Sequence, residues 1–209
     1  MISLSILVLV HNSKKRKLRY KKGATATINQ LQFQVLRPQN RGCSSKGVKL
    51  INRVLCCTNT AAACAVVPYS QWYPSPFTID YEHYNRAEQY MMSEKAKFFG
   101  DIVTRRNTMA SSDPTRHEDF GHSVPNFNQE HWEQHRCDIV VKGNLAKFLA
   151  PSLRQQLVDT GGKFLAEASP HDPVWGIGFR TDDMRAFQPP RWPALNLLGN
   201  ILNDDPPPA

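Results

Sequence analysis

The sequence predicts a mainly α-helical domain with a few short β-strands, preceded by a basic extension and followed by a proline-rich tail. Two observations predict this fold class. Apolar residues recur at helical spacing in several stretches between residues 84 and 202, whereas only short apolar runs suit strands. Every acidic residue lies at or after Asp80, so the first third of the chain differs in composition from the rest. We therefore predict a disordered extension at residues 1–66, one domain at 67–202 and a tail at 203–209.

The extension and the domain carry opposite net charge. Of the 26 lysines and arginines, 12 lie before Val67, where there is no aspartate or glutamate. The rest of the chain holds the other 14 basic residues and all 18 acidic ones, a net charge of −4. A segment of charge +12 cannot bury enough apolar surface to fold alone, but it suits contact with nucleic acid. The domain itself has no such excess.

The first residues and the cysteines bear on location. The apolar run at residues 1–10 is shorter than the roughly 20 residues that span a bilayer, and its positive charges follow it, unlike those of a signal peptide. The five cysteines form no CxxC pair, and only Cys137 lies in the domain, which favours a reducing compartment. We expect a cytoplasmic protein without membrane association. Nuclear or organellar targeting by the basic segment stays open.

The first elements of the domain follow from local patterns. Two prolines and three aromatic residues predict an extended segment near residues 69–80. The next residues predict a helix that ends at Gly100, followed by a second helix at 102–110. One face of the first helix carries Tyr84, Glu88, Met91, Met92, Lys95 and Phe99.

The later elements are marked by capping residues and glycines. Pro114 suits the first turn of a helix, and Asn128 is a candidate N-cap for a long amphipathic helix. A short helix is predicted at 152–160, a strand at 164–169, a loop rich in proline and glycine at 170–179, and a last helix at 195–202. The long helix is predicted to face the core through Trp132, Ile139, Leu145 and Phe148.

Glu88 and Lys95 are the first candidates for chemistry. They are seven positions apart, which places them on one helix face about 10 Å apart along the axis. A carboxyl group and an amine beside an apolar groove can shift in pKa, so that one acts as a general acid and the other as a nucleophile. The spacing alone favours an ordinary solvated charge pattern over this catalytic pair.

The loop E-A-S-P-H-D-P-V-W-G-I-G is the second candidate. Asp172 and Trp175 stand close together there, with Gly176 just beyond. A carboxylate beside a large aromatic ring can bind a sugar hydroxyl and stack on a base, although a lone tryptophan is as often part of a core. The pattern leaves both interpretations open.

The remaining motifs argue against metal and cofactor chemistry. His131 and His135 stand four residues apart, but no third ligand follows at zinc-like spacing and the HExxH order is absent. Cys137 is predicted to be a packed thiol. No GxSxG, GxGxxG or phosphate-binding loop occurs. We predict that the protein uses no metal and no cofactor.

Six blocks of sequence, taken together, resemble one known family. In order, they are W-Y-P-S-P-F, Y-N-R-A-E-Q-Y-M-M-S-E-K-A, H-W-E..R.D-I-V..G-N-L-A-K-F, L-V-D-T-G, L-A-E-A-S-P-H-D-P-V-W-G-I-G and L-N-L-L-G-N-I-L. Between Tyr69 and Leu202 they resemble the NADAR domain (YbiA-like) family. The resemblance implies a mainly α YbiA-like fold and an N-glycosidase that removes a ribosyl group from a nitrogen, with a ribosylated small molecule as substrate.

The resemblance also implies site residues. The essential glutamate of the family falls on Glu88, its motif lysine on Lys95, and its D..WG motif begins at Asp172; we predict these three as catalytic. The predicted substrate-binding set combines residues from the family motifs with two aromatic residues near the start of the domain, and consists of Trp72, Tyr84, Trp132, Lys147, Trp175, Gly176 and Asn196.

Three functions stay open at this point. The first is hydrolysis of phosphoribosylamino-pyrimidine intermediates of riboflavin biosynthesis, which releases ribose 5-phosphate. The second is release of ADP-ribose from guanine in nucleic acid, which the basic extension would favour and the acidic domain would not. The third is a module that binds ADP-ribose or a nucleotide without turnover. The presence of Glu88, Lys95 and Asp172 together argues against the third.

Overall fold

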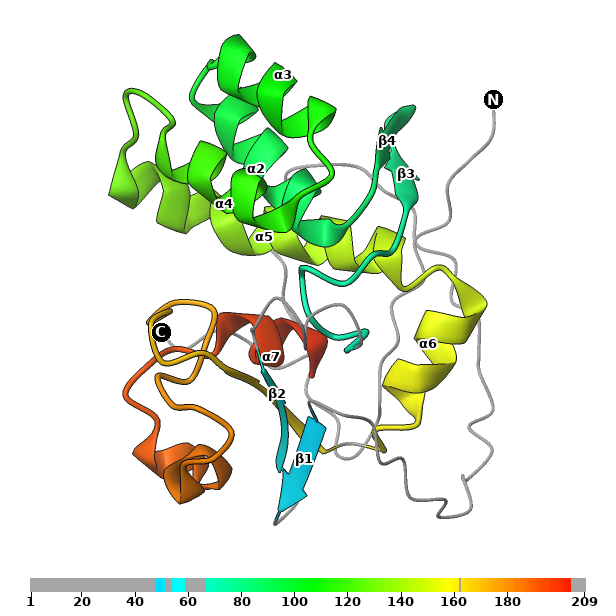
Figure 1. Ribbon diagram of the computed structural model, residues 1–209, viewed down its shortest axis with the longest axis vertical. Helices are drawn as coiled ribbons and strands as arrows, with labels where there is room; N and C mark the ends of the chain where they lie inside the picture. The colour runs from blue at the N-terminus through cyan, green and yellow to red at the C-terminus, as the bar shows by residue number, and fades with distance from the viewer. Residues whose placement is uncertain (1–47, 52–53, 59–66, 162, 204–209) are drawn as a thin grey trace, which may run out of the picture. The chain divides into compact units, whose positions relative to one another are not determined.

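The computed structural model describes residues 48–51, 54–58, 67–161 and 163–203 (Figure 1). The predicted extension lies outside these residues except for two strands, and so does the tail beyond residue 203. The described part is mainly helical, as predicted. In it, no helix is both long enough and apolar enough to cross a membrane.

Helix α2 is the centre of a group of four helices. It spans Ala87–Phe98 and contacts α3 (Ile102–Ala110), α4 (Pro114–His122) and α5 (Gln129–Lys147), which surround it in Figure 1. Helix α2 begins later than predicted, whereas the residues predicted to end α2 and to begin α4 and α5 are confirmed. Gly100 adopts a φ of +74° just after α2, Pro114 is the first residue of α4, and the Asn128 side chain accepts a hydrogen bond from the His131 N–H.

The second part of the fold is a three-stranded sheet. Strand β2 (Val54–Thr58) pairs antiparallel with β1 (Val48–Ile51) and parallel with β5 (Phe164–Ala168), the strand predicted at 164–169. Strands β1 and β2 fall inside the stretch that the sequence analysis assigns to the extension. The prediction missed them because both apolar runs are short and lie among basic residues, and because β2 pairs with a strand more than 100 residues away.

A hairpin precedes α2. It joins β3 (Phe77–Ile79) to β4 (Glu82–Tyr84) through Asp80 and Tyr81, which both have positive φ, as a tight two-residue turn requires. Tyr84 was predicted to lie in the helix, and this was wrong. Helical spacing fitted the residue equally well, but the turn reverses the chain and pairs Tyr84 with Phe77.

The buried stripe of α5 differs in one position from the prediction. Trp132 and Phe148 are buried and Ile139 is partly buried, but Leu145 is exposed. The buried face instead runs through small and polar residues in the second half of the helix. Gly143 lies there because a Cβ at this position would overlap the Tyr90 ring of α2.

Helix α7 (Leu197–Leu202) packs directly on β5. It begins two residues later than predicted because Asn196 adopts a left-handed conformation, with φ of +49°. The connection from β5 to α7 includes two short 3₁₀ segments, Met184–Phe187 and Pro189–Arg191, and α6 (Pro151–Val158) precedes the strand.

Gly199 is where the backbone of α7 lies closest to β5, and its replacement tests this packing. A Cβ at this position would overlap the Leu165 carbonyl oxygen and the Asn196 side chain. We expect Gly199→Ala to lower the free energy of unfolding by about 3 kcal/mol or more, since backbone cannot yield as a flexible side chain does. Thermal unfolding measures this.

Gly100→Ala is the matched control, because no atom lies within 4 Å of its added methyl group and only the positive φ costs about 1–2 kcal/mol. Equal losses in the two variants would contradict the close packing.

Candidate active site

Glu88 lies in the first turn of α2 and is only 4% exposed. Its backbone N–H donates to the Gln71 carbonyl at 3.0 Å, while no described residue gives its carboxyl group a hydrogen bond or an ion pair. Burial raises the pKa of Glu88 well above its ordinary range, and the negative charges of Glu118, Glu167 and Asp172 raise it further. Glu88 is therefore a buried carboxyl group whose surroundings favour its protonated form.

Lys95 lies two turns further along the same face of α2 and is 8% exposed. Its Nζ sits between two aromatic rings, 4.3 Å from the centroid of Phe127 and 5.7 Å from that of Trp132. Burial lowers the pKa of Lys95, and the charge of Glu88 opposes this shift. A lysine with a lowered pKa supplies more of the neutral amine, which is the nucleophilic form.

Apolar side chains fill the space beside this pair. Met91 and Met92 of α2 form a buried cluster with Trp132 of α5, and Trp175 packs against it from the 170–179 loop. The structure thus brings together, from three elements, two of the predicted substrate-binding tryptophans and the helix face that carries the predicted catalytic pair. The low dielectric of this cluster is the physical cause of the displaced pKa values.

Asp172 shapes the loop that follows β5. Its Oδ1 accepts hydrogen bonds from the backbone N–H groups of Val174 at 2.9 Å and Trp175 at 2.8 Å. Gly176 is required there because a Cβ would lie 2.9 Å from the Asp172 carbonyl oxygen and 2.9 Å from Cβ of Ser169. Among the described residues, none binds the second carboxylate oxygen of Asp172. Its charge reaches both Glu88 and Glu167.

Two predicted substrate-binding residues make buried contacts within the fold. Lys147 is fully buried, and its Nζ donates to the Ser70 carbonyl at 2.7 Å. The Asn196 side chain accepts from the Glu167 N–H at 3.1 Å and donates to the Leu165 carbonyl at 3.0 Å. Both side chains therefore make hydrogen bonds within the fold, and their predicted part in substrate binding stays a prediction.

The other two aromatic candidates lie at the hairpin and in the turns before it. Tyr84 packs on Tyr90 with ring centroids 5.0 Å apart, and its hydroxyl donates to Glu82 at 3.0 Å, so it belongs to the hairpin core. Trp72 is partly buried in a turn, where its carbonyl accepts from Arg86 at 2.9 Å. The predicted opening strand therefore begins only at Phe77.

Sequence reasoning missed Glu167. Alternation along β5 turns Ala166 and Ala168 toward one apolar cluster and Glu167 toward the opposite face. Burial raises the pKa of Glu167 to about 8, and the charge of Asp172 adds to this. Its Oε2 is buried and has no hydrogen-bond partner among the described residues. An acidic residue inside an apolar strand was the available signal.

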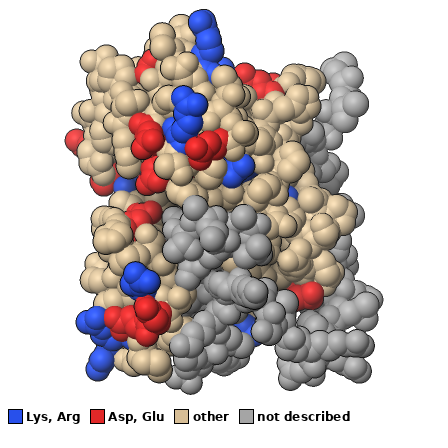
Figure 2. Space-filling view, viewed as in Figure 1, with Lys and Arg blue, Asp and Glu red and all other residues tan. Residues whose placement is uncertain are grey.

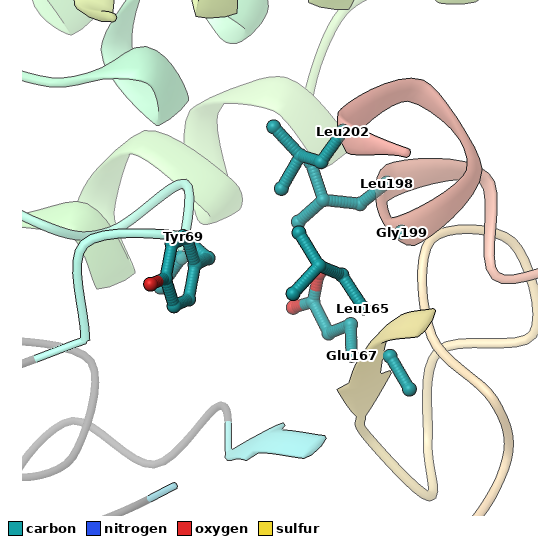
Figure 3. Close-up of a pocket in the computed structure, with 8 residues that line it drawn as sticks. Tyr69, Leu165, Glu167, Leu198, Gly199 and Leu202 are labelled. Atoms are coloured by element: carbon teal, nitrogen blue, oxygen red, sulfur yellow. The ribbon is translucent and has the colours of Figure 1, made fainter. Parts of the chain in front are cut away.

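Figure 3 shows the side chain of Glu167 directed into a small cavity between Tyr69 and the leucines of α7. The cavity is lined by Tyr69, Ser70, Leu165, Ala166, Glu167, Leu198, Gly199 and Leu202. Its lining is largely apolar, so it maintains the burial of the Glu167 carboxyl group.

In the described part of the chain, no three histidine, cysteine, aspartate or glutamate side chains lie close enough together to hold a metal ion. His131 and His135 are exposed on α5, and the His135 Nδ1 lies 2.8 Å from the His131 carbonyl oxygen. Free Cys137 is partly buried, and burial raises the pKa of its thiol.

Comparison with known proteins places the chain in a family. The model of the NADAR domain matches residues 61–204. N-glycosidase R617 of Acanthamoeba polyphaga mimivirus is 39% identical over 140 residues, which cover 64% of this chain and 82% of that protein. Protein irg-1 of Caenorhabditis elegans is 31% identical over 120 residues, covering 56% and 57% of the two chains.

Two further similarities concern a longer protein and a solved structure. Riboflavin biosynthesis protein PYRR, chloroplastic, of Zea mays is 31% identical over 128 residues, which are 58% of this chain but only 18% of that protein. The NMR structure of the E. coli protein YbiA has the same fold, with a TM-score of 0.56 and 21% identity, over 71% of this chain and 81% of that one. On the match of its whole helical part, the chain belongs to the NADAR domain family.

Proposed function

We propose that this NADAR domain is an N-glycosidase that hydrolyses the bond between the anomeric carbon of a ribosyl group and a nitrogen. The observation that carries the proposal is the buried pair Glu88 and Lys95 on one face of α2, each displaced in pKa toward its neutral form. A protonated carboxyl group can donate to the leaving nitrogen and an uncharged amine can attack the anomeric carbon, so both pKa shifts favour the form that covalent glycosyl transfer uses. The similarity to a protein named N-glycosidase supports the same reaction.

The covalent step uses Lys95 as nucleophile. Its neutral amine attacks the anomeric carbon, a C–N bond to Nζ forms, and the C–N bond to the base breaks with its electron pair going to the base. Glu88 gives its proton to the leaving nitrogen and becomes a carboxylate. Loss of a proton from Nζ to the ring oxygen opens the sugar and leaves an iminium ion between Lys95 and the anomeric carbon.

Hydrolysis completes the cycle. The Glu88 carboxylate takes a proton from water as the oxygen adds to the iminium carbon. The resulting adduct collapses to the free sugar and the amine of Lys95, with all protons returned. The free oxygen of Asp172 binds sugar hydroxyls or stabilises the positive charge near the anomeric carbon, as carboxylates do for oxocarbenium-like states. Trp132 forms the inner wall of the site.

A small ribosylated molecule is the substrate we favour, namely a phosphoribosylamino-pyrimidine of riboflavin biosynthesis. The similarity to a riboflavin biosynthesis protein supports this choice, although it spans only a small part of that protein. In Figure 2, basic and acidic side chains lie side by side on the visible face of the described residues, without a basic track for a nucleic acid.

The second candidate is removal of ADP-ribose from guanine in nucleic acid. The 12 basic residues before Val67 favour it, since a segment of this charge attracts phosphate groups. The substrate would then be held partly by residues outside the described part of the chain.

Product analysis by mass spectrometry separates the candidates. The full chain is incubated with a phosphoribosylamino-pyrimidine and, separately, with an oligonucleotide that carries ADP-ribosylated guanine. We expect release of ribose 5-phosphate from the first and no release by Glu88→Ala. Release of ADP-ribose alone would establish the second candidate, and binding without release of either sugar would identify a non-catalytic module.

A further inference from the structure

Phe127 is the exposed aromatic ring next to the proposed nucleophile. It is 40% exposed and lies directly before α5, after Asn126, whose φ is +57°. Its ring packs against that of Phe99 in an edge-to-face arrangement, with the ring centroids 5.3 Å apart. The Lys95 Nζ lies over this ring, 4.3 Å from its centroid. An exposed ring held in one orientation is a prepared stacking surface.

The two rings that flank Nζ differ in how much surface they offer. Trp132 is only 7% exposed and packs with Met91 and Met92, so little of its ring remains for a ligand. Phe127 keeps a large part of its ring in solvent. A planar group that approaches Lys95 from outside therefore meets Phe127 and not Trp132.

Reaction geometry then fixes where the leaving group lies. An anomeric carbon that reacts with Nζ must come within about 3–3.5 Å of it. The base is bonded to that carbon, so it lies within one or two bond lengths of the same point. With Nζ 4.3 Å from the ring centroid, a base on the solvent side of the site is in stacking range of Phe127.

We propose that Phe127 is the specificity-determining wall of the site, which stacks on a heteroaromatic leaving base and thereby selects ribosylated bases over ribosylated aliphatic amides. The inference rests on the proposed function, because it takes Lys95 as the nucleophile. It adds an exposed ring to Trp132 and Trp175, the two tryptophans of this cluster that the sequence predicts to bind the substrate. Trp132 is buried and lies on the interior side of Lys95.

The test compares two substrates and two phenylalanines. The substrates carry the same ribose 5-phosphate, one on a heteroaromatic amine and one on an aliphatic amide. Phe127→Leu keeps an apolar side chain beside Lys95 but removes the ring. Phe98→Leu is the matched control. Phe98 is 39% exposed, and its ring lies 4.5 Å from that of His135 and 5.0 Å from that of Phe99. Among the described residues, the rings that the Lys95 Nζ approaches are those of Phe127 and Trp132.

We expect Phe127→Leu to lower kcat/KM for the heteroaromatic substrate on the order of 10- to 100-fold, through KM more than kcat, because stacking acts before the bond breaks. Its kcat/KM for the aliphatic amide should stay within about 2-fold of the unchanged protein, and Phe127→Trp should restore the heteroaromatic substrate. Phe98→Leu should alter neither.

Equal losses on both substrates, or an equal loss in Phe98→Leu, would overturn the proposal. If the unchanged protein cleaves neither substrate, the proposed function fails, and binding of the intact heteroaromatic substrate decides the stacking separately. Binding weakened by Phe127→Leu and not by Phe98→Leu would support the stacking wall, and equal binding in all three proteins would reject it.

Discussion

Lys95→Ala is expected to lower kcat by at least about 10³-fold while leaving the protein folded, because removal of a nucleophile removes the covalent route and not only a contact. The lysine is buried and has no ion pair among the described residues, so its loss does not leave a partner charge unpaired. Thermal unfolding should therefore change little, while turnover disappears. Steady-state kinetics on the ribosylated substrate, with thermal unfolding in parallel, measures both effects.

Lys95→Arg is the informative control. The guanidinium group stays protonated at all accessible pH values, so it keeps a positive charge between Phe127 and Trp132 without supplying a free electron pair. We expect it to be as inactive as Lys95→Ala. Activity within about 10-fold of the unchanged protein would show that the charge of Lys95 matters and that no adduct forms.

Glu88→Gln is expected to lower kcat by about 10²–10⁴-fold, since the amide keeps the shape of the carboxyl group but has no proton to transfer. The pH dependence of the reaction rate tests whether Glu88 acts as the acid. The acid form protonates the leaving nitrogen, and burial raises the pKa of Glu88, so the rate of the unchanged protein should fall as pH rises through that pKa. The residual rate of Glu88→Gln should lack this descending limb.

Stability provides a second readout for Glu88. The pKa in the folded state is raised above the unfolded value, so ionisation disfavours folding and stability falls as pH rises from about 4.5 through the folded pKa. Glu88→Gln removes this loss and should unfold at a higher temperature than the unchanged protein at pH 8. A variant that is both less stable at pH 8 and unchanged in pH profile would mean that Glu88 serves the fold and not the reaction.

Local signals predicted much of the fold. Helix ends were set by capping side chains and by glycine at positive φ, both of which depend on adjacent residues, so Gly100, Pro114 and Asn128 fell where expected. Strands β1 and β2 were not predicted, because they lie in a strongly basic stretch and because β2 pairs with β5 across more than 100 residues of sequence. Leu145 was misplaced because helical spacing does not fix which of two adjacent stripes faces the core.

The site was predictable in part. Seven-residue spacing places Glu88 and Lys95 on one face of α2, but burial of that face depends on α4, α5 and the loop after β5. Asn196 resembled a ligand-binding residue in sequence, whereas its left-handed backbone turns the side chain onto β5. Phe127 lies in an ordinary polar stretch of sequence, and only the folded chain brings its ring to Lys95.

Reductive trapping tests the central claim most directly. The full chain is mixed with its ribosylated substrate in the presence of borohydride, digested and analysed by mass spectrometry. Hydride reduction of the iminium ion converts it to a stable secondary amine, so we predict a single modified lysine, Lys95, heavier by the reduced open-chain sugar, and none in Lys95→Arg. Substrate cleavage without any trapped adduct, or an adduct on another lysine that persists in Lys95→Arg, would contradict the account.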